Sequence, residues 1–249
     1  GILHKNAKVI QLNGTKELTS ALVETGKEKI QSTIIFDYCI STMPIKDLFN
    51  AFSFTIPSDI KYISDNLVYR DFITVGILLD KTKIELNDNW IYIQESYVKV
   101  GRIQVFNNWS PFLVKESDTT WLGLEYFCNE NDALWQLEVD ELIALATEEL
   151  IQLGFIDSQK NVLDATVIKV PKTYPAYFGA YNKFYKIREF VDSIDNLFLI
   201  GRNGMHKYNN QDHSMLTAMQ AVQNIKKGIL SKENIWSINT EEEYHEEKK

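Results

Sequence analysis

The chain has 249 residues, a hydrophobic fraction of 45% and a formal net charge of −8. This length suits one large domain or two small ones, and this composition excludes a disordered or fibrous chain because it supplies enough apolar surface to bury a core. No cluster of Lys or Arg departs from the acidic balance strongly enough to hold a phosphate backbone, so we expect no nucleic-acid partner.

Two absences in the sequence bear on location and metal chemistry. No apolar run reaches the roughly 18 to 20 residues that a membrane-spanning helix requires, and the first residues lack the apolar core of a signal peptide, which together favour a cytoplasmic protein. Cys39 and Cys128 lie far apart without a ligand partner nearby. We therefore expect buried thiols and no metal site.

The N-terminal segments predict a small antiparallel unit. Residues 9–12 and 32–40 are rich in strand-forming side chains, and hairpin turns are expected at Asn13-Gly14 and in the polar stretch 24–29. The second strand stops at Met43-Pro44, after which Ile45, Leu48 and Phe52 follow with helical spacing. A buried strand therefore leads into a strand-to-helix turn at Ser41, Thr42 and Met43.

The middle of the chain predicts a sheet followed by a helix. Strand-like segments occur at 72–79, 90–93, 101–106 and 120–127, and we expect them to share one sheet. Apolar residues from 140 to 153 then recur on one helical face, with Gly154 as the stop signal.

The C-terminal third alternates strands and helices. A strand at 162–170 is expected to end at Pro171, a helix follows over 177–190, and 196–201 is a short apolar strand. We expect Leu197 to Ile200 to leave an apolar face that drives self-association. A long helix over 214–230 is expected to group Met215, Leu216, Met219, Val222 and Ile225 on one face.

The segment from Gly201 to Ser214 combines features that suit an anion. Gly201 and Gly204 permit close approach of the backbone, Arg202 offers a planar fork for phosphate oxygens, and the following helix begins with free N–H groups. The alternative is that Arg202 pairs with a surface carboxylate and that the Asn, Gln and His side chains merely cap the helix.

The run Gly201-Arg-Asn-Gly-Met-His-Lys-Tyr-Asn-Asn-Gln-Asp-His-Ser-Met-Leu-Thr-Ala218 resembles the C-terminal flavin motif of bacterial FAD-dependent oxidoreductases in the amine oxidase and protoporphyrinogen oxidase superfamily. Within this superfamily it is most similar to the branch near UDP-galactopyranose mutase. Further similar segments are Asp37–Pro44, Tyr69–Val75, Gly101–Pro111 and Leu122–Phe127. The likeness covers nearly all of residues 7 to 230.

One family feature does not occur in this sequence. Members begin with a Gly-x-Gly-x-x-Gly turn that holds the FAD pyrophosphate, but the 11 glycines here include no Gly-x-Gly. We therefore expect the C-terminal part of a longer flavoprotein, with FAD bound in the full-length parent and the N-terminal Rossmann part as the missing partner. On its own, this part is expected to be inactive and to bind FAD weakly or not at all.

The resemblance implies an α+β fold. It contains a mixed, largely antiparallel substrate-domain sheet with helices, and the C-terminal strand and helix of an incomplete Rossmann-like FAD-binding domain. The expected divisions are 1–45 for strands of the FAD-binding domain, 46–193 for the substrate domain, 194–230 for the C-terminal strand, flavin motif and helix, and 231–249 for a charged tail.

The resemblance also assigns residues to a site. The cofactor-binding residues it implies are Ser41, Thr42, Met43, Gly201, Arg202, Asn203, Gly204, Met205, Asn210, Gln211 and Asp212. The substrate-binding residues it implies are Arg70, Arg102, Asn108, Trp109, His206 and Tyr208. Surface ion pairs remain the alternative for the two arginines, a core position for Trp109, and a surface hydrogen bond for His206. No catalytic residue is assigned.

The function implied is that of a flavoenzyme acting on a small molecule or a nucleotide sugar. The two chemistries left open are an amine oxidase-like oxidoreductase and a UDP-galactopyranose mutase-like enzyme of surface polysaccharide synthesis. His206 stands where the mutases carry a tyrosine, and the loop before Asp212 is one residue longer, which weighs against the mutase. A binding module without flavin is the alternative from another class.

Overall fold

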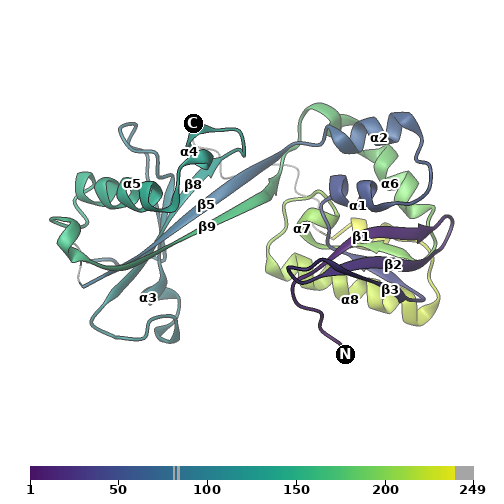
Figure 1. Ribbon diagram of the computed structural model, residues 1–249, viewed down its shortest axis with the longest axis horizontal. Coiled ribbons are helices and arrows are strands. Elements are labelled where there is room, and N and C mark those ends of the chain that lie inside the picture. The colour runs from purple at the N-terminus through teal and green to yellow at the C-terminus, as the bar shows by residue number, and fades with distance from the viewer. Residues whose placement is uncertain (81, 83–84, 239–249) are drawn as a thin grey trace. The chain divides into compact units, whose positions relative to one another are not determined.

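The structure is a computed structural model that describes residues 1–80, 82 and 85–238. The described chain forms two compact units, one made of residues 1–69 with 174 onward, and the other of residues 70–173. The chain passes between them in β5 (Tyr69–Leu79) and in β9 (Val162–Pro175) (Figure 1). The second unit is thus shorter at both ends than the expected substrate domain, 46–193.

The first unit begins with an antiparallel sheet of three strands in the order β1-β2-β3. Its strands are β1 (Ala7–Gly14), β2 (Leu18–Thr25) and β3 (Ile30–Ile35). β2 was not predicted, because the polar Thr19 and Ser20 interrupt the apolar pattern of its sequence. The single strand expected at 32–40 is in fact two strands, β3 and β4 (Cys39–Ser41), which belong to different sheets.

A short parallel pair lies at the centre of this unit. β4 pairs with β10 (Leu197–Leu199) in the register Leu197↔Cys39 and Leu199↔Ser41. The β10 side chains are at most 3% exposed. The expectation of an exposed apolar face at Leu197–Ile200 is therefore wrong, because these residues lie inside the core.

Three helices explain why the first unit extends to residue 69. α1 (Ile45–Ala51), α2 (Ser58–Asp65) and α6 (Phe184–Asp192) bury apolar side chains in the same core as β10. A 3-10 turn, Gly179–Lys183, replaces the beginning of the helix expected at 177–190. The side chains that these helices bury in that core are Ile45, Leu48, Phe49, Ala51, Ile63, Ile187 and Val191.

Two helices follow β10. α7 (Gly201–Gly204) is one short turn, and α8 (Gln211–Lys227) ends at Gly228, whose φ of 64° is the left-handed conformation of a helix C-cap. The buried side of α8 consists of Thr217, Ala221 and Asn224. Of the side chains predicted on one face of this helix, Met215, Leu216, Met219 and Val222 are 60%, 50%, 60% and 44% exposed, whereas Ile225 is partly buried against the core.

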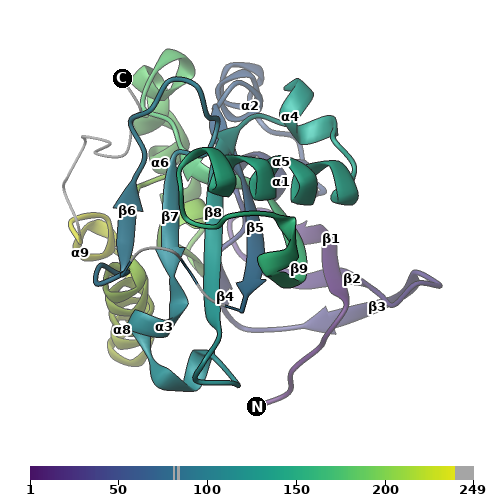
Figure 2. The same cartoon turned by 90° about the vertical axis from the view of Figure 1, so that its left-hand side faces the viewer.

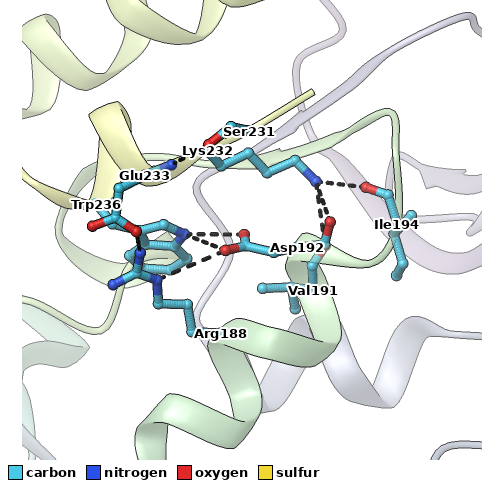
Figure 3. Close-up of polar contacts among 8 residues, drawn as sticks. All are labelled: Arg188, Val191, Asp192, Ile194, Ser231, Lys232, Glu233 and Trp236. Atoms are coloured by element: carbon cyan, nitrogen blue, oxygen red, sulfur yellow. Dashed lines mark hydrogen bonds and ion pairs between the residues drawn. The ribbon is translucent and has the colours of Figure 1, made fainter. Parts of the chain in front are cut away.

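The chain beyond residue 231 is not simply a solvated tail. α9 (Glu233–Trp236) packs on the end of α6, and Ile235 is 1% exposed. Figure 3 shows the Lys232 amino group donating to the main-chain oxygens of Ile194, at 2.6 Å, and of Val191 and Asp192. A cation there stabilises the negative end of the helix dipole. The most charged part of the expected tail, 239–249, lies outside the described residues.

The second unit contains one sheet in the order β6-β7-β8-β5-β9, as the sequence predicted for its first four strands. Besides β5 and β9 it holds β6 (Trp90–Tyr92), β7 (Arg102–Val105) and β8 (Thr120–Cys128). β9 continues past Pro171, where it was expected to end, because an edge strand tolerates proline.

One face of this sheet is covered by α5 (Val139–Gln152), the predicted helix, as Figure 2 shows. Leu142, Ala146 and Leu150 are fully buried against it. The short helices α3 (Phe106–Trp109) and α4 (Ala133–Gln136) complete the unit. Among the residues that the structure describes, no helix is long and apolar enough to cross a membrane.

Candidate functional site

The end of β4 and the short helix α7 meet in the first unit. Ile200 donates its N–H to the main-chain oxygen of Ser41 at 3.0 Å. At Gly204 a Cβ atom would lie 2.5 Å from that same oxygen and 3.2 Å from Cα of Thr42. The structure thus brings together two segments, 41–43 and 201–205, that the sequence assigned to one cofactor site.

Gly201 joins this site to α8. Its φ of 69° lies in the left-handed region, which favours glycine. Its N–H donates to Oγ1 of the buried Thr217 at 3.1 Å. Thr217 in turn donates to the main-chain oxygen of Ser214. Thr217 stands in the run that resembles the flavin motif, but no role was predicted for it.

Arg202 lies beside a pair of aromatic rings. Its Cζ atom is 4.7 Å from the ring centroid of Tyr208 and 5.1 Å from that of Tyr174, and Nε donates to the main-chain oxygen of Asn209 at 2.9 Å. The two rings are stacked, with centroids 6.0 Å apart. Tyr174 was not predicted, because β9 was expected to end before it. The guanidinium is therefore held in a fixed plane.

The N-terminus of α8 presents three exposed residues, namely Asn210, Gln211 and Asp212. Asn210 occupies the N-cap position, but its side chain accepts no capping hydrogen bond. The side chain of Asn210 therefore does not cap the helix, which was the alternative considered for it. The first-turn N–H groups carry a partial positive charge, which the carboxylate of Asp212 offsets in part.

Three buried side-chain atoms in the described chain have no hydrogen-bond partner: Oδ1 of Asn203, Nδ1 of His206 and Nδ1 of His213. All three belong to the segment 203–213. Nδ1 of His213 lies 3.4 Å from the Asp212 carboxylate, near enough for an ion pair once the ring is protonated, although no hydrogen bond forms. Because buried polar groups are almost always paired in folded proteins, these three atoms set this segment apart from the rest of the described chain.

His206 is fully buried in an aromatic cage. The ring centroids of Tyr69, Tyr181 and Phe184 lie 4.6 to 5.8 Å from that of His206, and its Nε2 is 3.2 Å from the main-chain oxygen of Ala176. Burial lowers the pKa of His206 to about 4. The ring is therefore neutral at pH 7, and the surface position considered for it is wrong.

The other predicted substrate residues are in the second unit. Asn108 donates to the main-chain oxygens of Leu86 and Asp88, and Trp109, 44% exposed, packs edge-on against Trp90 at 5.1 Å. Arg70 is half-buried near the start of β5. Arg70 lies in β5, whereas Asn108 and Trp109 lie in the short helix α3.

Arg102 is 4% exposed and pairs with Glu125, which is 1% exposed. Gln104 donates to the same carboxylate, and the guanidinium lies 4.4 Å from the ring centroid of Trp90. A surface ion pair is therefore wrong for Arg102, since the pair is internal. Its charge already has a partner, which leaves less of it for an anionic substrate.

The chain is similar to known proteins in its fold and not in its sequence. No protein-family model matches the chain, and no curated protein matches it. Solved structures do match. A reduced UDP-galactopyranose mutase superposes with a TM-score of 0.77 at 20% identity, over 95% of this chain and 50% of that one.

Two further solved structures share the fold. A putative protoporphyrinogen oxidase from Exiguobacterium sp. 255-15 has a TM-score of 0.57 at 14% identity, over 79% of this chain and 42% of that one. An oxidoreductase from Methanosarcina mazei has a TM-score of 0.51 at 12% identity, over 80% and 44%. The chain thus has a fold of helices and antiparallel sheets that is similar to that of the UDP-galactopyranose mutase structure and of these two structures. It spans about half the length of these structures.

Proposed function

We propose that the chain is the flavin-contacting and substrate-binding part of an FAD-dependent enzyme. The observation that carries this proposal is the group of unpaired buried atoms on Asn203, His206 and His213, all within the flavin-like motif. An unpaired buried polar atom costs about 1 to 3 kcal/mol. A bound polar ligand would remove that cost where it reaches these atoms.

The surrounding residues fit a flavin dinucleotide. Gly204 brings α7 against the end of β4, and the first turn of α8 offers N–H groups to a phosphate or a ribityl hydroxyl. Arg202, in contact with two tyrosine rings, suits a planar ring edge or pyrophosphate oxygens. When bound, FAD would supply the redox or covalent chemistry, while these residues bind and orient it.

A nucleotide sugar is the substrate class that we favour. The support is that the mutase superposes over 95% of the chain, against 79% and 80% for the two oxidase-like structures. Tyr174 and Tyr208 present stacked rings beside Arg202, an arrangement that suits a sugar or a base next to phosphate. His206 stands where the mutases carry a tyrosine, and this difference weighs against a nucleotide sugar as the substrate.

The test is to express the chain together with all coding sequence of its reading frame and to record the visible absorbance after dialysis. A yellow protein with stoichiometric FAD is expected. A colourless protein that takes up no added FAD would contradict the proposal, whereas a flavin-loaded protein that ignores nucleotide sugars would contradict only the substrate class.

Asn203→Ala sharpens this test. It removes the unpaired oxygen, so the unfolding free energy of the flavin-free protein should be unchanged or higher, while FAD dissociates faster. A purely structural asparagine would give the opposite result for stability. Asn66→Ala is the matched control, because Asn66 is exposed at the end of α2 and should leave FAD retention unchanged.

A further inference from the structure

Residues 231–236 belong to the part of the chain that was expected to be a charged tail, yet they are anchored in the first unit. Lys232 is 4% exposed, and its Nζ atom donates to the main-chain oxygen of Ile194 at 2.6 Å (Figure 3). On α8, the fully buried Asn224 exchanges two side-chain hydrogen bonds with Asn234, both at 2.8 Å. We call residues 231–236 the clasp, because they join the end of α6 to α8.

Trp236 of the clasp lies along one side of α6. Phe184, Arg188 and Asp192 are spaced four residues apart, so they share a side of this helix. The indole Nε1 donates to the two carboxylate oxygens of Asp192 at 3.0 and 3.1 Å, and Cζ of Arg188 is 5.4 Å from the indole ring centroid. The ring of Phe184 meets the indole edge-on, with centroids 6.2 Å apart. Trp236 thus packs along the length of this helix.

Phe184 connects the clasp to His206. Its ring centroid is 5.8 Å from that of His206, so it forms one wall of the aromatic cage. Phe184 is only half-buried, whereas His206 is 0% exposed. A half-buried phenylalanine can move to another rotamer unless its neighbours prevent it. Trp236 therefore restrains the wall that keeps His206 covered.

The conformation of His206 depends on such support. Its φ of 47° lies in the left-handed region, which residues other than glycine keep only where the surrounding structure enforces it. Nε2 is 3.2 Å from the main-chain oxygen of Ala176. Because a carbonyl oxygen only accepts hydrogen bonds, Nε2 carries the proton of the neutral ring. The unpaired Nδ1 then offers a lone pair, which suits a ligand that donates a hydrogen bond.

We propose that the clasp positions His206 for the ligand of the motif. Trp236 keeps Phe184 against the imidazole ring, and Lys232 fastens the clasp to the end of α6. Both are positioning residues, because they act on His206 through Phe184. The proposal rests on the proposed function for the presence of a ligand, whereas the contacts that hold His206 are present without one.

The pKa of His206 reports whether its cage is closed. Burial lowers this pKa to about 4, and the hydrogen bond with the oxygen of Ala176 opposes the shift. The titratable side chains that face the ring are Tyr69 and Tyr181. If Phe184 moves away, water reaches the imidazole and its pKa rises toward 6.5. A purely structural role for Trp236 would lower the free energy of unfolding but leave the pKa of His206 in the folded protein unchanged.

An NMR titration of the imidazole protons, without added flavin, tests the proposal. His206→Gln assigns the resonance among the four histidines. Trp236→Leu should raise the pKa of His206 by about one unit or more, because desolvation of a buried group shifts its pKa by up to several units. Trp236→Phe keeps an aromatic ring beside Phe184 and should restore a pKa near the original value.

Lys232→Met tests the fastening separately. It keeps an unbranched apolar stem but removes the donor to the end of α6, and it should raise the pKa of His206 in the same direction. Lys227→Met is the matched control, since Lys227 is exposed at the end of α8 and should leave this pKa unchanged. If Trp236→Leu does not fold, the comparison of Lys232→Met with Lys227→Met decides the outcome.

An unchanged pKa of His206 in folded Trp236→Leu and in Lys232→Met would overturn the proposal. FAD binding, measured separately, keeps its failure distinct from that of the proposed function. A protein that takes up no FAD but shows the expected rise in pKa would support the clasp and contradict the flavin proposal. A protein that retains FAD and shows no change in pKa would contradict the clasp alone.

Discussion

Gly204 lies against the main-chain oxygen of Ser41 so closely that a methyl group on its Cα would come within 2.5 Å of that oxygen. The two residues are the points at which the β4 strand end and the α7 turn touch. Because main-chain atoms at a strand end cannot rotate away as a side chain does, the contact fixes α7, and with it Arg202 and Asn203, relative to β4.

Gly204→Ala should therefore destabilise the protein by about 1 to 3 kcal/mol, the usual cost of overpacking. Thermal unfolding measures the effect, and a domain of this size loses about 2 to 4 °C for each kcal/mol. Gly1→Ala is the control, since Gly1 is exposed and nothing lies within 4 Å of an added Cβ. A Gly204→Ala protein as stable as the Gly1→Ala protein would show that α7 can move away from Ser41.

The pKa of His206 predicts how the free energy of unfolding depends on pH. Its pKa falls from 6.5 to about 4 on folding, because burial disfavours the charged ring. The unfolded chain then binds more protons between these values, so the stabilisation is complete above pH 6.5 and is lost as the pH falls toward 4. At 1.36 kcal/mol per pKa unit, the total is about 3 kcal/mol.

Urea unfolding at pH 7 and pH 4.5 should show most of this loss. In His206→Gln the loss attributable to residue 206 should disappear, whereas His4→Gln, at an exposed position, should behave as the original protein does. Asp192 has a raised pKa and changes stability with the opposite sign, but the comparison between variants cancels its contribution. An identical pH profile in His206→Gln would contradict the assignment.

Arg102 and Glu125 give a prediction about stability rather than substrate affinity. Arg102→Ala leaves a buried carboxylate without its main partner and should cost about 3 to 5 kcal/mol. The double change Arg102→Met with Glu125→Leu should restore most of that loss, since both charges are removed together. Calorimetry of the three proteins checks the expectation. Lys186→Ala breaks an exposed ion pair and should have a much smaller effect.

A contrary result here would be informative. If Arg102→Ala unfolds at the original temperature and only raises the substrate KM, then Arg102 holds an anionic substrate, as the resemblance implies. The sequence could not distinguish the two roles, because an arginine in a strand has the same local pattern whether its partner is a ligand or a carboxylate 23 residues away on the next strand.

The same limit explains what could and could not be predicted elsewhere. β5, β8 and α5 were predicted correctly from their apolar periodicity. Their buried residues pack against one another in the core of the second unit. The exposure of Met219 could not be predicted, because an apolar stripe on a helix has the same sequence pattern whether or not the described residues include a surface that packs against it. Motif residues 201–205 were found by resemblance, whereas Tyr174, which contacts Arg202, lies on β9 outside the motif.

Arg202 is the residue on which the flavin proposal can be tested most sharply. Tyr174 and Tyr208 hold its guanidinium in one plane, and Asn209 accepts a hydrogen bond from Nε. Lysine keeps the charge at this position but has neither the flat face that stacks on the rings nor the paired donors of the fork. A charge-assisted hydrogen bond is worth about 1.5 to 3 kcal/mol, and each 1.4 kcal/mol is a factor of ten in affinity.

In the protein expressed from its complete reading frame, Arg202→Lys should therefore raise the dissociation constant for FAD about ten- to a hundredfold while the circular dichroism spectrum stays the same. Arg70→Lys is the matched control and should leave flavin affinity unchanged, because Arg70 lies outside the segments 41–43 and 201–212 that the resemblance assigns to the cofactor. Equilibrium dialysis against FAD measures both constants. If Arg202→Lys retains FAD as tightly as Arg70→Lys does, the tyrosine rings hold Arg202 for packing alone and its guanidinium does not contact the cofactor.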